Sequence, residues 1–564
     1  MIFSYFAHRR DCDAKQTERK SRIANLNPKY DDPLTSSDTS VLSLPVSSLV
    51  AAVNTHALDP ANILTAYGKQ ALIAHRQTNC LTEIMIADAE QRLQSRSHSH
   101  SRGPLAGMPI SLKDEIGVQG FDATLGYSAF VGHPTPRDSS IVTLLRDAGA
   151  IPFVKTNVPT TLLSYECGND VFGTTTHPYN DAYTCGGSTG GEAALIACGG
   201  SRVGVGSDVA GSVRVPAHWC GVYALKASSG RFCVSGGRAS APGQEGVPVV
   251  HSPLAKTLED LEYFFKAVLS MEPWRYDHSV LPIPWRNVDI PADKPLKWGV
   301  LWDDGIVRPS PACERALRMV TSALEQAGHT VITLNPPSIS EGYTIGAGLL
   351  MGDMGTSVSA PLRTSERLDP GIRGALHTAW LPRWVKSLFA WYTRHILADP
   401  VCASIISNSH TISVAEYWAV IAQRNNYRAR WHDMWLGDGL DFVLSVPHPL
   451  PAMPHGGMKA GFNVIGYAFL WNVLDYPAGI IPVTRVDRVK DSLFARSDLD
   501  RACTDSQREF TPRNGLEAGI YGLYDADSMH GLPVGIQIVG QRLEEEKVFE
   551  GMKIVEALLN GGGS

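Results

Sequence analysis

Apolar positions recur with helical spacing from residue 46 onward. The cap signals Asp59-Pro60 and Asn62 open a predicted helix. The apolar positions of this helix are Ile63, Leu64, Tyr67, Ala71 and Leu72. A second helix is predicted over residues 81–93, and a polar loop follows it at residues 95–102.

Beyond this loop, short apolar runs alternate with helical patterns. The predicted strands are 108–112, 151–155, 297–301 and 532–539. The predicted helices are 139–148, 192–198, 259–269 and 544–559. This alternation favours an α/β protein in which helices pack on a sheet.

The chain divides into three regions by composition. Residues 1–45 are polar and rich in Ser, Asp and Pro, which predicts a partly disordered arm. Residues 46–560 form one large domain, and residues 561–564 read as a flexible tail. In the loop at 95–102, His98 and His100 could hold a metal or lie on a solvated linker, and both interpretations stay open.

The composition excludes several classes of protein. The net charge of −6 gives no overall basic field for nucleic acid. The ten cysteines form no Cys-x-x-Cys pair, which argues against a zinc site or a disulfide framework. The apolar run at residues 2–7 precedes its basic residues, the wrong order for a signal peptide. The apolar stretch at 462–483 is interrupted by polar residues, which indicates buried core and not a membrane span. We therefore expect a cytoplasmic protein.

Candidate chemistry is concentrated at residues 185–216, where two glycine-rich turns each present a serine, Ser188 and Ser212. Glycines let backbone N–H groups converge on a developing oxyanion. Glu192, in the first turn of the helix that follows, suits the helix dipole. No Gly-Lys-Ser/Thr follows either turn, so a phosphate-binding P-loop is excluded.

Residues 186–190 also satisfy Gly-x-Ser-x-Gly, the nucleophile elbow of α/β-hydrolases. That motif requires a buried strand directly before it, and residues 180–184 read as loop. It also requires an earlier oxyanion-hole segment, whereas the His-Gly-Gly at 455–457 comes late in the chain. This alternative is therefore the weaker one.

Several separated motifs resemble the amidase-signature enzymes, most closely the branch of fatty acid amide hydrolases and fungal acetamidases. The matching segments are 103–117, 156–159, 186–195, 206–216, 220–221, 474–483 and 531–541. The resemblance implies the amidase-signature fold, an α/β architecture with a central mixed β-sheet covered by helices on both faces. It also implies an amidase, which hydrolyses a carboxylic amide to the acid and ammonia or an amine.

The resemblance implies a Ser–Ser–Lys catalytic triad. Ser212 would be the acylated nucleophile, Ser188 the bridge on a cis peptide bond, and Lys113 the base. A serine hydroxyl is a poor nucleophile until a base takes its proton. A lysine can act as that base only when neutral, and burial favours the neutral form. On the residues alone, a salt bridge between Lys113 and Asp114, or another acid, remains an alternative.

The implied oxyanion hole consists of the backbone N–H groups of Val209, Ala210, Gly211 and Ser212. Two positions depart from the family pattern, since Thr189 and Ala210 stand where serine and glycine are usual. Thr189 keeps a hydroxyl, whereas the Cβ of Ala210 would either narrow the acyl site or lower the rate. Thr189, Asp208 and Arg214 are expected to support the nucleophile turn.

Residues 381–397 form a basic amphipathic pattern at roughly the place of the membrane-facing cap in fatty acid amide hydrolases. They would either lie peripherally on a membrane or pack against the domain. If they form a cap, an apolar acyl chain becomes a plausible substrate group. Segments 164–167, 177–179 and 453–457 are candidate walls of the pocket.

The leading hypothesis is a serine amidase that forms an acyl-enzyme and needs no cofactor or metal. Its ligand would be a small-molecule amide, not nucleic acid. One alternative is the amidase subunit of a glutamine-dependent amidotransferase complex, and another is a non-catalytic scaffold. The sequence leaves the oligomeric state open, a homodimer included, and does not choose the acyl group.

Overall fold

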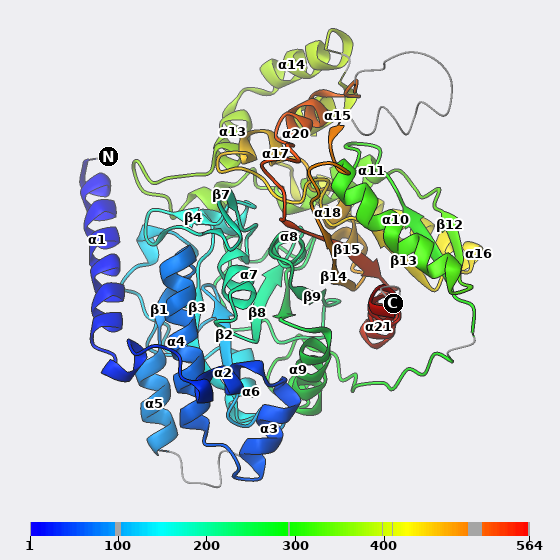
Figure 1. Cartoon of the computed structure of the whole chain (residues 1–564). Coiled ribbons are helices and arrows are strands. Elements are labelled where there is room, and N and C mark those ends of the chain that lie inside the picture. The colour runs from blue at the N-terminus through cyan, green and yellow to red at the C-terminus, as the bar shows by residue number, and fades with distance from the viewer. Residues whose placement is uncertain are drawn as a thin grey trace.

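The computed structural model describes residues 2–95, 103–291, 294–397, 399–408, 410–493 and 510–561, and a large mixed β-sheet lies at its centre (Figure 1). The strands of this sheet are Leu81–Ile84 (β1), Pro109–Lys113 (β2), Ile151–Thr156 (β3), Val203–Asp208 (β8), Tyr223–Lys226 (β9), Val250–Ala255 (β10), Lys297–Leu301 (β11), Thr330–Thr333 (β12), Phe442–Ser445 (β13), Ala478–Arg485 (β14) and Pro533–Val539 (β15). They pair in the order β1-β3-β2-β8-β10-β9-β14-β15-β13-β11-β12. Two small hairpins pair Gly168–Asn169 (β4) with Gly173–Thr174 (β5), and Thr176–His177 (β6) with Asn180–Thr184 (β7).

The sheet combines parallel and antiparallel pairs. β2 is parallel to both of its neighbours, β3 and β8, and β11 is parallel to β12 and β13. The five pairs β8–β10, β10–β9, β9–β14, β14–β15 and β15–β13 are antiparallel. The predicted mixed α/β sheet is therefore confirmed. Because β2 and β8 are parallel neighbours, their carboxyl ends meet at one edge of the sheet.

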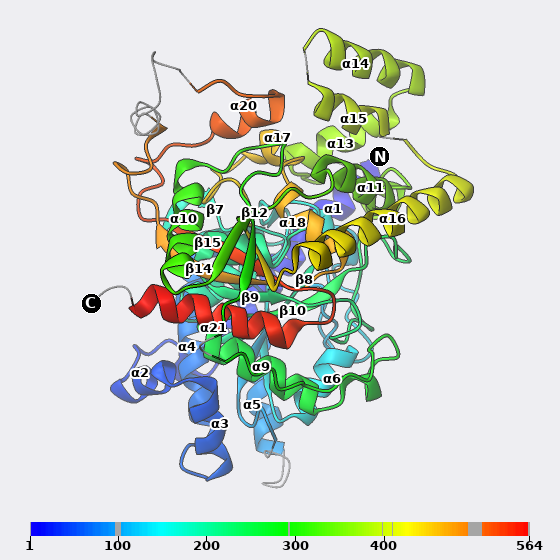
Figure 2. The ribbon, with the colours of Figure 1, turned by 90° about the vertical axis from the view of Figure 1, so that its right-hand side faces the viewer.

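Helices cover both faces of the sheet (Figures 1 and 2). One face carries α4 (Pro60–Thr78), α7 (Gly190–Ala197) and α8 (Arg214–Cys220), and the opposite face carries α9 (Leu258–Ser270) and α21 (Glu545–Gly561). The other helices of the body are α2 (Ser36–Ser43), α3 (Val46–Asn54), α5 (Ile86–Ser95), α6 (Ser140–Asp147), α10 (Pro311–Gln326), α11 (Ile339–Leu350), α16 (Val414–Asp438) and α18 (Gly466–Leu474). α4 begins as predicted, because the Asp59 side chain accepts the Ala61 N–H and Pro60 occupies the first turn.

A group of short helices projects beyond the sheet at the top of Figure 1. It comprises α12 (Thr356–Ser359), α13 (Pro370–Trp380), α14 (Arg383–His395), α15 (Pro400–Asn408), α17 (Met458–Gly461) and α20 (Gly515–Tyr521). We refer to α13, α14 and α15 as the cap helices. α14 packs on α15 through a small apolar cluster of Ala390, Ala403 and Ile406.

The first half of the segment predicted as a partly disordered arm, residues 1–45, is a single helix in the structure. Residues Ile2–Ala24 form α1, whose polar side chains bond to the body. Lys15 is buried and pairs with Glu83 at 2.5 Å and with Asp122 at 2.9 Å. Arg19 donates to the Leu81 carbonyl at 2.7 Å. Composition alone misled the prediction, because these polar residues serve as contacts to the domain.

The predicted helix at 81–93 is wrong over its first turn. Residues Leu81–Ile84 are all buried and form β1, antiparallel to β3, and α5 begins only at Ile86. In a short apolar run, periodicity cannot distinguish a buried strand from a buried segment of helix. The stretch 462–483 is buried core as predicted, and it contributes α18 and β14.

None of the helices within the described ranges combines the length and apolar character needed to span a bilayer. His98, His100 and the tail residues 562–564 lie outside the described residues.

Candidate active site

One strand end and two turns bring the predicted triad residues to the shared edge of β2 and β8. Lys113 is the last residue of β2, and Ser188 lies in the turn that enters α7. Ser212 lies in the turn between β8 and α8. The Gly187–Ser188 peptide bond is cis, as the resemblance implies. The two serine turns are joined directly, because the Thr189 N–H donates to the Ser212 carbonyl at 3.0 Å.

The Lys113 amino group is held by two hydroxyls. Its Nζ lies 2.8 Å from Ser188 Oγ and 2.8 Å from Ser207 Oγ, with the Ser207 carbonyl at 3.5 Å. A neutral amine has two N–H donors and one lone pair. If the donors are directed to Ser207, the lone pair faces the Ser188 hydroxyl and can accept its proton. Ser207 was not identified from the sequence.

Burial lowers the pKa of Lys113, because the side chain is fully enclosed and the charged form loses its hydration, while Glu115 acts in the raising direction. The alternative salt bridge with Asp114 is not formed. The Asp114 carboxylate instead accepts from Thr124 and Leu125. The nearest carboxylate to Lys113 is Glu115, at 3.8 Å.

A buried ion pair fixes the nucleophile turn. Asp208 and Arg214 are both fully buried and are joined at 3.0 Å, and Arg214 also donates to Asn472 at 2.6 Å. The Arg214 guanidinium lowers the pKa of Asp208 against the opposing effect of burial. Thr189 is also buried, and its hydroxyl donates to the Ser207 carbonyl at 3.2 Å. These contacts fit the supporting roles predicted for the three residues.

The predicted oxyanion donors are not equivalent. The Gly211 N–H already donates to Asp208 at 2.9 Å, so it is used within the turn. The N–H groups of Val209, Ala210 and Ser212 have no acceptor among the described residues. Gly211 has a φ of 101°, and a Cβ there would lie 2.6 Å from Ala468. Gly211 therefore shapes the loop, and the other three residues supply the available donors.

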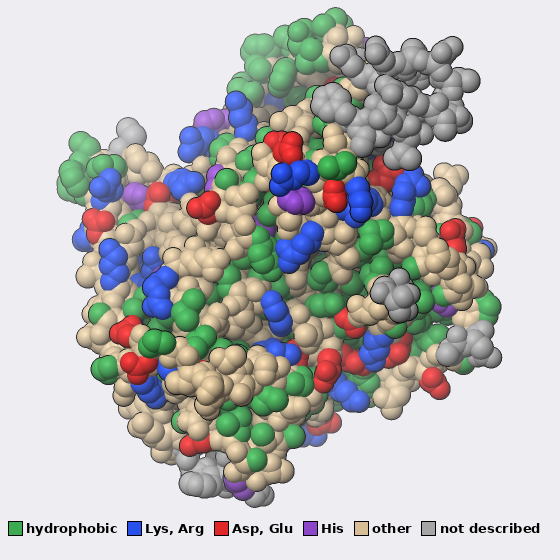
Figure 3. Space-filling view, viewed as in Figure 1, with side chains coloured by type: hydrophobic (Ala, Val, Ile, Leu, Met, Phe, Trp, Pro, Cys, Tyr) green, Lys and Arg blue, Asp and Glu red, His purple; other side chains and the backbone are tan. Residues whose placement is uncertain are grey.

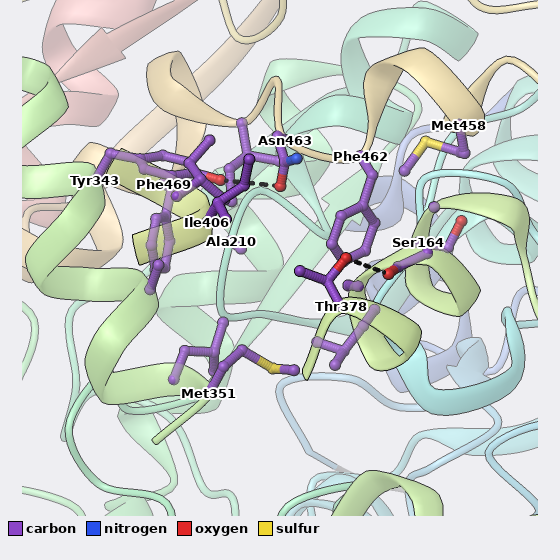
Figure 4. Close-up of a pocket in the computed structure, with 18 of the residues that line it drawn as sticks. Ser164, Ala210, Tyr343, Met351, Thr378, Ile406, Met458, Phe462, Asn463 and Phe469 are labelled. Atoms are coloured by element: carbon purple, nitrogen blue, oxygen red, sulfur yellow. Dashed lines mark hydrogen bonds between the residues drawn. The ribbon is translucent and has the colours of Figure 1, made fainter. Parts of the chain in front are cut away.

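Ser212 opens into a cavity of about 500 Å³ that extends under the cap helices (Figure 4). Within the described chain, Ser212 Oγ makes no hydrogen bond, which leaves the hydroxyl accessible from this cavity. Apolar side chains from α11, α13, α15 and α18 dominate the wall, and Phe462 and Met458 close it from another side. Lys459 is the single Lys, Arg, Asp or Glu among the described residues that line it.

The predicted pocket walls are partly correct. Ser164 and Tyr165 line the cavity, and the Tyr165 hydroxyl donates to the Ala210 carbonyl at 2.5 Å. Segments 177–179 and 453–457 do not line it. His177 instead contacts the Trp219 carbonyl at 2.9 Å. Most of the wall comes from helices far apart in sequence, which periodicity could not bring together.

The nucleophile-elbow alternative fails on topology. Residues Asn180–Thr184, read as loop from the sequence, form strand β7. This strand pairs with β6 in a small hairpin, makes one isolated bridge from Tyr183 to Pro454, and does not belong to the central sheet. An elbow serine follows a strand of the central sheet, so Ser188 lacks that setting.

A profile of the amidase family matches residues 62–549. Amidase 1 of Gibberella moniliformis is 32% identical over 561 residues, which cover 97% of this chain and 99% of that protein. Acetamidase of Aspergillus oryzae is 32% identical over 550 residues, 94% of this chain and 92% of that protein. A solved structure of fatty acid amide hydrolase superposes with a TM-score of 0.80 at 28% identity, covering 93% of this chain and 87% of that one.

The fold, the matched motifs and these relatives define a hydrolase that acts on amides. The chain belongs to the amidase family.

Proposed function

We propose that this amidase cleaves its substrate through Ser212, with Lys113 as base and Ser188 as proton relay. The observation that supports this proposal most strongly is the buried Lys113 amino group, 2.8 Å from Ser188 Oγ. A lysine in that environment is poised to be neutral, and it has a hydroxyl in place to deliver a proton.

In the acylation step, Ser212 Oγ attacks the amide carbonyl and its proton passes to Ser188, whose own proton passes to Lys113. The carbonyl oxygen becomes an oxyanion that receives hydrogen bonds from Val209, Ala210 and Ser212. When the C–N bond breaks, the relay reverses and protonates the leaving nitrogen. Water then repeats the sequence on the acyl-enzyme and releases the acid.

We propose that the acyl group of the substrate is apolar. The cavity beside Ser212 is large, extends beneath the cap helices and is lined mainly by apolar side chains. Burial of each methylene contributes about 0.8 kcal/mol, so a chain that fills the cavity binds far better than acetyl. The printed names of the relatives include both acetamidase and fatty acid amide hydrolase, and the cavity favours the longer class for this chain.

We further propose that the cap rests peripherally on a lipid surface. One face of α14 packs on α15, and the exposure of Trp384 (71%) and Leu388 (61%) on the same helix supports a lipid contact over packing against the domain. Figure 3 shows apolar side chains gathered at this outer end of the molecule. The basic residues Arg383 and Arg394 flank the apolar surface on the same helix, as suits anionic lipid.

Vesicle co-sedimentation tests the lipid contact. Trp384→Ser should reduce binding to vesicles that contain phosphatidylserine. Trp418→Ser is the matched control, since Trp418 is 68% exposed on α16, outside the cap. Equal binding by both variants and the wild type would remove the membrane proposal and leave the catalytic one intact.

Ammonia release from a panel of primary amides tests the catalytic proposal. The purified chain alone should hydrolyse hexanamide and dodecanamide, and Lys113→Ala should lose this activity at neutral pH. Activity only on glutamine, and only with a partner protein, would instead favour the amidotransferase subunit.

A further inference from the structure

The carboxyl group of Glu115 lies just behind the proposed base. Glu115 is 4% exposed and lies two residues after Lys113. Its Oε1 is 3.8 Å from Lys113 Nζ and has no hydrogen-bond partner among the described residues. A buried carboxylate oxygen that accepts no hydrogen bond is costly unless a positive charge lies near. Lys113 is the one cation that the described residues place within ion-pair distance of it.

The other ionisable groups around Lys113 already have partners of their own. The groups that face it from the packed elements are Asp114 on its own segment, Asp208 on β8, His251 on β10, Glu192 on α7 and Cys167.

Asp208 is paired with Arg214, as described above. Glu192 accepts hydrogen bonds from Ser111 and from Thr156, the latter at 2.7 Å, and burial raises the pKa of Glu192 to about 7.

His251 Nδ1 contacts the Cys233 carbonyl at 2.7 Å. Asp114 accepts from Thr124 and Leu125 through Oδ2, while its Oδ1 has no partner among the described residues and forms no ion pair with Lys113. Glu115 is thus the acid whose closest polar partner is the Lys113 amine.

We propose that Glu115 is the countercharge that stabilises the protonated Lys113 formed when Ser212 attacks the substrate. Glu115 touches no reacting atom, so it is a positioning residue that acts through Lys113. The inference rests on the proposed function, since it requires Lys113 to be the base.

The countercharge is needed only while the proton is on Lys113. Before attack, the amine is neutral and hydrogen-bonded to Ser188 and Ser207. During attack, one proton moves from Ser212 to Ser188 and one from Ser188 to Lys113, so an ammonium appears inside the fold. It lies 3.8 Å from a carboxylate of opposite sign. When the amide C–N bond breaks, the proton returns through Ser188 to the leaving nitrogen and the ammonium disappears.

The substitution Glu115→Gln keeps the shape and removes the charge. A carboxylate favours the charged lysine, so its removal lowers the pKa of Lys113. The acid limb of the kcat/KM profile, which reports the free enzyme, should move down by about one pH unit. The plateau of kcat/KM should fall about tenfold, because a one-unit change in the pKa corresponds to a tenfold change in equilibrium. Glu115→Asp, which restores the charge, should return the limb toward the wild-type position.

Glu366→Gln provides a matched control. Glu366 is also a buried carboxyl, but it accepts from the backbone N–H groups of Ser128 and Arg363. Its loss should leave the acid limb in place. Rates are normalised to active sites by fluorophosphonate titration, so that poor folding of a variant does not imitate a catalytic loss. If Glu115→Gln fails to fold, Glu115→Ala carries the test, because it also removes the charge and should move the acid limb down.

An active Glu115→Gln enzyme whose acid limb stays at the wild-type pH, or moves up, would overturn the role of Glu115 alone. A wild-type chain that cleaves no amide, or a Lys113→Ala variant with full activity, would instead overturn the proposed function.

Discussion

Narrowing the cavity mouth should change which amides are cleaved without changing the chemistry. Gly374 lies on α13, lines the cavity, and has open space within 4 Å of the position a Cβ would occupy. A phenylalanine introduced at residue 374 therefore fits the backbone and projects at the mouth of the cavity. Ser212 and its partners lie on other elements, so the reacting groups stay in place.

The expected loss of kcat/KM follows from the apolar contacts that the substrate chain would lose in the cavity. If the new ring displaces about three methylenes of a bound chain, the loss is about 2.4 kcal/mol, at about 0.8 kcal/mol for each. That energy corresponds to about 50-fold in kcat/KM. Gly374→Phe should thus lose about 50-fold on dodecanamide and less than about twofold on acetamide, whose acyl group does not reach the cap.

The assay compares kcat/KM for acetamide, hexanamide and dodecanamide in wild type and variant. Gly437→Phe is the matched control, because Gly437 is also helical, with open space around it, and lies on α16 away from the cavity. An equal loss on short and long amides, or the same loss in both variants, would refute the assignment of this cavity to the acyl chain.

Three further outcomes follow from the site. Burial lowers the pKa of Lys113 from its usual 10.5, and the lysine must be neutral to act, so the midpoint of the rise of kcat/KM with pH should lie below that value. A midpoint above it would contradict Lys113 as base. Ser207→Ala should lower kcat by about 10- to 150-fold, since a hydrogen bond to a charged group contributes about 1.5–3 kcal/mol. Ser207→Thr should restore kcat, and equal losses in both variants would contradict this. Arg214→Met should reduce the free energy of unfolding in urea by about 3–5 kcal/mol, because Asp208 is left buried and unpaired. Arg318→Met removes a largely exposed ion pair and should cost less than about 1 kcal/mol; similar losses for the two arginines would contradict the burial argument.

Much of the sheet and its flanking helices was predictable from periodicity. The strand at Lys297–Leu301 has the predicted bounds, and the strand at Ile151–Thr156 differs by one residue at its end. Both are short apolar runs between helical patterns, where burial and strand propensity agree. β1 was missed because its four residues are buried on both faces and show no alternation. α1 was missed because its polar residues bond to the domain.

The catalytic residues of the candidate site were predictable where local sequence motifs identify them. The two glycine-rich turns identify Ser188 and Ser212, and the family resemblance adds Lys113. Glu115 lies two residues after Lys113 in the sequence, but strand periodicity does not place it there. β2 ends at Lys113, and the turn closed by the Ile116 N–H and the Lys113 carbonyl brings the Glu115 carboxyl near the amine. Ser207 could not be predicted, since its role depends on the parallel alignment of β2 with β8, which brings it to Lys113.

The cavity and the oxyanion donors depend on tertiary structure. The cavity walls come from α11, α13, α15 and α18, which are separated by long stretches of chain. The use of the Gly211 N–H by Asp208 likewise appears only when the turn is closed by the ion pair to Arg214. Sequence patterns indicate which side chains and backbone N–H groups are present near the site. Which of them face the substrate depends on the tertiary structure.

Peptide mapping after labelling with a fluorophosphonate tests the identity of the nucleophile most directly. The wild-type chain should carry a single adduct on the peptide that contains Ser212, and Ser212→Ala should carry none. Lys113→Ala should label far more slowly at neutral pH, because the hydroxyl then lacks its base. An adduct on Ser188, or labelling that persists in Ser212→Ala, would contradict the account.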